Sequence, residues 1–108
     1  MSLQGIEVGA IAGQINAELQ GEKDKKVSDV THDSRAAREG FLFAAIRGLT
    51  MDGHRFVADV MRRGAIGVIS ELDAPENFRG AWLKVKNARQ AMAKAAAVIN
   101  GNPSRELK

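Results

Sequence analysis

The sequence contains no cysteine, and among its 108 residues there are only two prolines, four phenylalanines and one tryptophan. The absence of cysteine excludes disulfides, cysteine nucleophiles and thiolate metal sites. It is compatible with a cytoplasmic protein without requiring one. No apolar run approaches the ~20 residues of a membrane-spanning helix, and no segment has the pattern of a secretory signal. Nothing in the sequence therefore predicts a membrane partner.

The common catalytic signatures are also missing. There is no G-x-x-x-x-G-K-[ST] phosphate loop, no G-x-G-x-x-G turn and no H-E-x-x-H pair. The two histidines, His32 and His54, do not have the spacing of a metal site. A Ser34, His54 and Asp52 triad can be assembled from the composition, but no nucleophile elbow surrounds the serine. We therefore expect no catalytic residue and no metal ligand in this chain.

Size and charge leave several function classes open. A length of 108 residues suits one compact domain, and 44% hydrophobic with 27% charged residues is an ordinary globular mixture. The net charge of +3 could reflect solubility alone, a nucleic-acid partner or a phosphate-bearing small molecule. The only dense charge run, residues 22–26, carries both signs and is expected to form a solvated turn.

Apolar residues at helical spacing predict three helices. The helices are expected over residues 7–19, 53–63 and 88–100. Asp52 and Asn87 precede the second and third of these, where a side-chain oxygen can accept from free backbone N–H groups. Gly64 follows the second helix, where a left-handed residue commonly ends a helix.

Four short segments, 27–33, 41–46, 66–70 and 82–86, predict strands. The run 41–46 is continuously apolar, which is typical of a strand buried on both faces, whereas 82–86 alternates as a half-buried strand does. The predicted order is α-β-β-α-β-β-α. Strands separated by helices predict an α/β single domain with a sheet flanked by helices, and strands that follow one another directly suggest that the sheet is mixed.

Polar residues follow two of the predicted strands. Residues 31–35 end the first strand and residues 48–53 follow the second. Ligands of open α/β sheets bind outside the strand ends, where hydroxyls and backbone groups can contact a nucleobase edge and apolar side chains can cover its face. Here the candidates are His32, Ser34, Leu49, Thr50 and Met51. Ser34 could instead only cap a turn. Asp33 and Arg35 are expected to hold the loop together, although Arg35 could face a diphosphate.

Six segments share their order and spacing with a known family. They are D-S-R at 33–35, G-F-L-F-A-A at 40–45, Gly48, D-G-H-R-F at 52–56, R-G-A-I-G-V-I at 63–69 and N-P-S-R-E-L-K at 102–108. Together they resemble the N-terminal domain of the Mur ligases, over roughly residues 27–108. The resemblance is closest to the members that add the third amino acid to UDP-N-acetylmuramoyl-L-alanyl-D-glutamate. Phe41 departs from the aspartate usual in the family, and residues 49–51 fall in a segment that varies between members.

The resemblance implies a function for the whole chain. Residues 1–108 would form the UDP-substrate-binding domain of a cytoplasmic ligase of peptidoglycan synthesis, with the central and C-terminal domains outside this chain. His32 and Ser34 would line the uridine pocket from the first strand end, and residues 49–51 would close it. The fragment itself would hold no cofactor and would not be catalytic. ATP and Mg²⁺ would belong to the full-length enzyme, whose ATP-binding domain would be this domain's partner.

Two other functions stay open. Within the family, the ligase that adds the terminal D-alanyl-D-alanine has a similar N-terminal domain, but the full D-S-R and the N-P-S-R-E-L-K segment favour the third-residue ligase. From another class, a basic nucleic-acid-binding module fits the sign of the charge. Few aromatics, no basic stripe and a net charge of only +3 disfavour it, because single-strand binders combine stacking aromatics with a charged groove.

Overall fold

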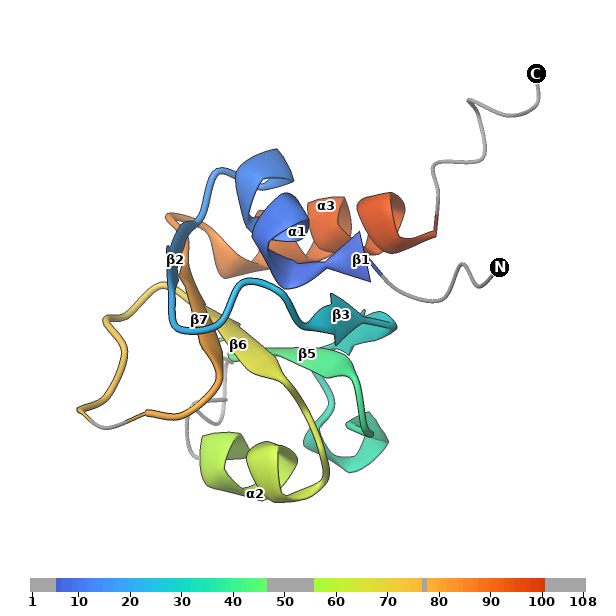
Figure 1. The fold of residues 1–108 in the computed structure, drawn as a ribbon, viewed down its shortest axis with the longest axis vertical. Coiled ribbons are helices and arrows are strands. Elements are labelled where there is room, and N and C mark those ends of the chain that lie inside the picture. The colour runs from blue at the N-terminus through green and yellow to red at the C-terminus, as the bar shows by residue number, and fades with distance from the viewer. Residues whose placement is uncertain (1–5, 47–55, 77, 101–108) are drawn as a thin grey trace.

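A five-stranded sheet forms the centre of the fold in the computed structural model, which describes residues 6–46, 56–76 and 78–100. Its strands, in spatial order, are β2 (Glu18–Gln20), β7 (Ala81–Lys84), β6 (Gly67–Ser70), β5 (Phe41–Ala44) and β4 (Asp29–Thr31). A small second sheet pairs β1 (Ile6–Glu7) with β3 (Lys26–Val27). Helices α1 (Val8–Gln14) and α3 (Ala88–Ile99) cover one face of the large sheet and α2 (Val57–Arg62) lies on the other (Figure 1). The predicted α/β class, with a mixed sheet flanked by helices, is confirmed.

The sheet is mixed for a reason other than the one predicted. The strands that follow one another without an α-helix, β4 with β5 and β6 with β7, are parallel. The first pair is connected through a short 3₁₀ helix, η1 (Ser34–Ala36), and the second through residues 71–80. The antiparallel strand is β2, which pairs with β7 at the edge of the sheet.

The prediction of one helix over residues 7–19 was wrong beyond its first two turns. Helix α1 ends at Gln14, and Asn16 has a φ of 59°, a left-handed conformation that turns the chain. Ile15 and Leu19 have helical spacing, yet Ile15 packs in the core after the helix and Leu19 packs against it from β2. The apolar spacing therefore predicted correctly which side chains pack in the core, but it predicted wrongly that they belong to one continuous helix.

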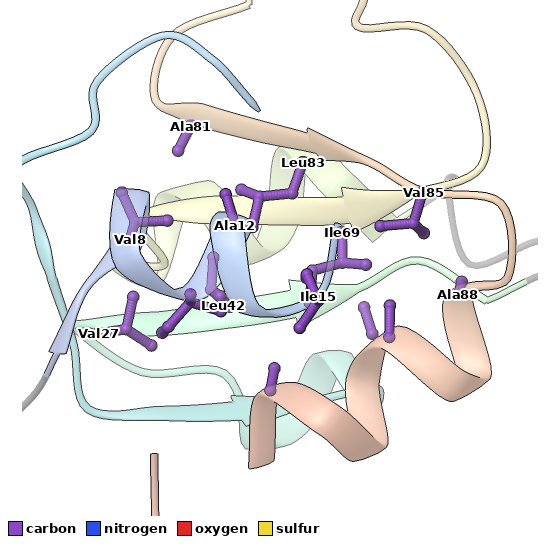
Figure 2. Packing of buried hydrophobic residues seen from close by; sticks show 14 residues of the cluster. Val8, Ala12, Ile15, Val27, Leu42, Ile69, Ala81, Leu83, Val85 and Ala88 are labelled. Atoms are coloured by element: carbon purple, nitrogen blue, oxygen red, sulfur yellow. The ribbon is translucent and has the colours of Figure 1, made fainter. Parts of the chain in front are cut away.

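The sheet divides the hydrophobic core into two clusters. Successive residues of a strand point to opposite faces, so Leu42 lies under α1 and α3 whereas Phe43 faces α2. Figure 2 shows the first cluster, in which Ile69 and Leu83 of the sheet meet side chains of the covering helices. The predicted burial of residues 41–46 on both faces is confirmed for β5. The half-buried pattern predicted for 82–86 was wrong, because β7 lies between two strands and is covered on both sides.

The helix ends follow the local sequence. The side chain of Asn87 accepts from the backbone N–H of Gln90 at 3.0 Å, as predicted for the start of α3. Gly64, just after α2, has a φ of 106°, which confirms the predicted left-handed ending. The predicted cap Asp52 lies outside the described residues. Among the described residues, no helix is long and apolar enough to cross a membrane.

Candidate functional site

The described part of the predicted site, His32 and Ser34, lies at the carboxyl end of β4, beside β5. These neighbouring strands run parallel, with Thr31 opposite Phe43, so the residues that follow both strands emerge at the same edge of the sheet. His32 and Ser34 come directly after β4. The structure therefore places both of them just beyond the carboxyl end of a parallel strand.

The other half of the predicted site consists of residues 49–51. Leu49, Thr50 and Met51 lie outside the described residues, between residues 46 and 56. Their closing of a uridine pocket stays a prediction. So does the expected absence of a metal site, although no group of three potential metal-binding side chains occurs among the described residues.

Two successive side-chain caps organise the turn after β4. The hydroxyl of Thr31 accepts from the backbone N–H of Asp33 at 3.0 Å. The carboxylate of Asp33 in turn accepts from the backbone N–H of Arg35 at 2.9 Å and forms the N-cap of η1. The predicted role of Asp33 in holding the loop together is confirmed by this bond. A cap of this kind satisfies a backbone donor that would otherwise have no partner within the helix.

Asp33 also forms an ion pair with the side chain of Arg35. The guanidinium Nε lies 3.2 Å from Oδ1, and Nη2 lies 3.4 Å from Oδ2. The hydrogen bonds from the Arg35 side chain and backbone hold the pKa of the Asp33 carboxyl below its ordinary value. The carboxylate is therefore ionised at neutral pH. The Arg35 side chain is 86% exposed, so water and salt screen its attraction to Asp33.

Ser34 is not the residue that caps this turn. Its own carbonyl accepts from the N–H of Ala37 at 3.4 Å, and the N-cap is Asp33. Ser34 is half-buried, and its hydroxyl makes no hydrogen bond to any of the described residues. His32, one residue after β4, is exposed. The turn therefore presents a hydroxyl and an imidazole at the strand end while other side chains hold its backbone.

A hollow of about 410 Å³ lies at the same end of the parallel strands, beyond β7, and the sequence analysis did not predict it. It is formed by the end of α1, the residues after β7 and the first turns of α3, and it is lined by Ile15, Asn16, Val85, Lys86, Asn87, Gln90, Ala91 and Lys94. His32 and Ser34 do not line it. Since β6 and β5 separate β7 from β4, this hollow is distinct from the predicted uridine site.

Comparison with known proteins identifies the family. The family described as "Mur ligase family, catalytic domain" matches residues 26–99. The chain belongs to the Mur ligase family. The Mur ligases that it resembles include the UDP-N-acetylmuramyl-tripeptide synthetase of Deinococcus radiodurans, 41% identical over 92 residues, which are 84% of this chain and 19% of that protein. The UDP-N-acetylmuramoyl-L-alanyl-D-glutamate--2,6-diaminopimelate ligase of Solibacter usitatus is 40% identical over 82 residues, which are 76% of this chain and 17% of that protein.

Solved Mur ligase structures share the fold. MurF from Acinetobacter baumannii superposes with a TM-score of 0.76 and 23% identity, over 97% of this chain and 23% of that one. MurF ligase from Thermotoga maritima in complex with ADP gives 0.56 and 31% identity, over 68% of this chain and 17% of that one. The chain thus spans about a fifth of the length of the Mur ligases that it matches. The predicted family is confirmed.

Proposed function

We propose that this chain binds the UDP end of UDP-N-acetylmuramoyl-L-alanyl-D-glutamate for an ATP-dependent ligase of peptidoglycan synthesis. Relatives in the family carry that substrate in their names. The observation that carries the proposal is the turn after β4, where two caps fix the backbone and leave the Ser34 hydroxyl unused by the described residues. A hydroxyl both donates and accepts, so it can pair with the uracil edge or with a ribose hydroxyl.

In this proposal the domain is an anchor for the substrate. Binding energy from the UDP group, remote from the reacting carboxylate, would position that carboxylate for chemistry elsewhere in the protein. Residues 49–51 would close the pocket over the base, and His32 would lie beside it. The ATP- and Mg²⁺-dependent steps would belong to the remaining four-fifths of a Mur ligase, which would function in the cytoplasm and whose ATP-binding domain would be the partner of this one.

An amide-shift titration of the 108-residue chain with UDP and with UDP-N-acetylmuramic acid tests the proposal. We expect both ligands to move the resonances of residues 31–35 and 48–54. If those resonances stay unmoved at millimolar ligand, the uridine-pocket proposal fails. RNA binding that weakens steeply with salt, with no response to UDP, would favour a nucleic-acid-binding module instead.

Substitution of Ser34 by alanine is expected to weaken UDP binding about five- to tenfold, because one hydrogen bond is lost on ligand binding. The thermal midpoint should change little, since the hydroxyl makes no hydrogen bond to the described residues. Ser28→Ala is the matched control, because Ser28 is an exposed serine just before β4, at the opposite end of that strand. Equal loss of affinity in both variants would contradict a contact made by Ser34.

The D-alanyl-D-alanine-adding ligase is the second candidate, favoured by the fold shared with MurF. Both reactions use a UDP-linked substrate, so UDP binding does not separate them. The two candidates are separated by an assay of the full-length gene product, with UDP-N-acetylmuramoyl-L-alanyl-D-glutamate as one substrate and the corresponding tripeptide as the other. We expect amino-acid addition to the dipeptide, as the names of the relatives in sequence indicate. Turnover of the tripeptide alone would identify the second candidate.

A further inference from the structure

The two caps in the turn after β4 each span one of the two candidate site residues that the structure describes. The bond from Asp33 N–H to Thr31 Oγ1 closes around His32. The bond from Arg35 N–H to Asp33 Oδ1 closes around Ser34. The carbonyl of Asp33 also accepts from Ala36 N–H at 2.9 Å, which begins the 3₁₀ turn. Asp33 therefore takes part in both caps, as the donor in one and as the acceptor in the other.

The main-chain bond is the shorter of the interactions that Asp33 forms with Arg35, and its donor is the better fixed in position. Its 2.9 Å length compares with 3.2 and 3.4 Å for the guanidinium contacts. It is a charge-assisted bond to a donor whose position the 3₁₀ turn fixes. The guanidinium belongs to a long side chain that is 86% exposed, and an exposed ion pair of this kind contributes little.

We propose that Asp33 is a positioning residue for uridine-nucleotide binding, and that it acts through the backbone N–H of Arg35 and not through the Arg35 guanidinium. This inference rests on the proposed function, because it assigns the geometry of the same site. Asp33 touches no ligand in this account. Its carboxylate fixes the backbone on either side of Ser34, so that the hydroxyl meets the nucleotide without first having to be ordered.

A competing role for Arg35 makes a different prediction. If the guanidinium contacted the diphosphate, loss of the side chain would weaken binding of UDP and leave binding of uridine unchanged. If Asp33 acts through the main chain, an arginine substitution keeps the N–H group and leaves both ligands bound. Comparison of uridine with UDP therefore separates the two roles in one chain.

The test is titration of the 108-residue chain and its variants with uridine and with UDP, followed by amide shifts, with thermal midpoints measured in parallel. Asp33→Ala is expected to weaken both ligands about tenfold. Asp33→Asn, which keeps an acceptor and is an equally good N-cap, should stay within about twofold of the unaltered chain. Arg35→Gln should also stay within about twofold for both ligands. Loss of the cap should also lower the thermal midpoint of Asp33→Ala by several degrees, so the affinities are compared at a temperature at which every variant is folded.

The Thr31 pair repeats the test at the other cap, in case Asp33→Ala does not fold. Thr31→Val removes the acceptor at nearly constant volume and should weaken both ligands, whereas Thr31→Ser restores the acceptor and the affinity. Failure of the unaltered chain to bind either ligand overturns the proposed function and this inference with it. Undiminished binding by Asp33→Ala or by Thr31→Val overturns the inference alone. So does an Arg35→Gln variant that loses UDP but keeps uridine.

Discussion

Substitution of Trp82 by alanine is expected to lower the free energy of unfolding by about 3–5 kcal/mol. The side chain lies in β7, is 2% exposed and is the largest fully buried side chain of the described core. Its indole N–H donates to the carbonyl of Leu72 at 2.8 Å, and its ring meets that of Phe78 edge to face at 5.0 Å. Alanine removes the ring that fills the cluster facing α2 and a bond that ties Leu72 to the sheet.

Trp82→Phe is the matched control for this loss. It keeps an aromatic ring against Phe78 and removes only the indole donor and part of the volume, so we expect a loss of about 1–2 kcal/mol. Urea unfolding followed by circular dichroism measures both variants. A domain of this size is stable by only about 5–15 kcal/mol, so Trp82→Ala should show a clearly lower midpoint. Equal midpoints for the two variants would mean that the ring is not a packing element of the core.

The sequence predicted those parts of the fold that depend on local chemistry. Asn87 was identified as a cap because the residue type and the helical period after it determine that role. The apolar run in β5 identified a strand covered on both faces. The errors arose where pairing partners decide the structure. Leu19 continues the helical apolar spacing of Val8, Ile11 and Ile15, but the backbone of residues 18–20 pairs with β7, which lies more than sixty residues away in sequence. The spacing of apolar residues does not show which distant strand a segment pairs with.

Of the candidate site, too, only the parts that depend on local chemistry could be predicted from the sequence. The position of His32 and Ser34 after a strand and the loop-holding role of Asp33 could be predicted, because an aspartate side chain in a turn commonly accepts from the backbone N–H two residues on. Outside the site, the bond between Glu71 and the start of α3 could not be predicted, since the Glu71 carboxylate accepts from Ala88 N–H across 17 residues. The hollow beside Lys86 was missed for the same reason, because it is built from three elements that are separate in sequence.

Substitution of Gly21 by alanine is expected to destabilise the chain by about 3–5 kcal/mol, through backbone strain and overpacking together. Gly21 follows β2 and has a φ of 95°, a conformation that alanine rarely adopts. An added Cβ would also press on the main-chain oxygen of Gly80, far inside van der Waals contact. Gly80 has a φ of 110° and directly precedes β7, so neither backbone can move aside without disturbing the only antiparallel pairing of the described large sheet.

Gly13→Ala is the control that isolates this contact. Gly13 lies in α1 and is exposed, and an added Cβ there would meet nothing within 4 Å. Alanine is favoured over glycine in a helix, so this variant should be more stable by up to about 1 kcal/mol. Urea unfolding of the two variants should therefore give changes of opposite sign. A Gly21→Ala variant as stable as the unaltered chain would contradict the close approach of the two turns.

Gly21→Ala also tests whether a loss of stability alone weakens UDP binding. Strands β2 and β4 lie at opposite edges of the sheet, with three strands between them. The disturbance at Gly21 is therefore remote from the turn that carries Ser34. We expect Gly21→Ala, studied at a temperature where it stays folded, to bind UDP as tightly as the unaltered chain, while Ser34→Ala binds more weakly at unchanged stability. If Gly21→Ala lost affinity as well as stability, the uridine site would depend on the whole sheet and not on the capped turn after β4.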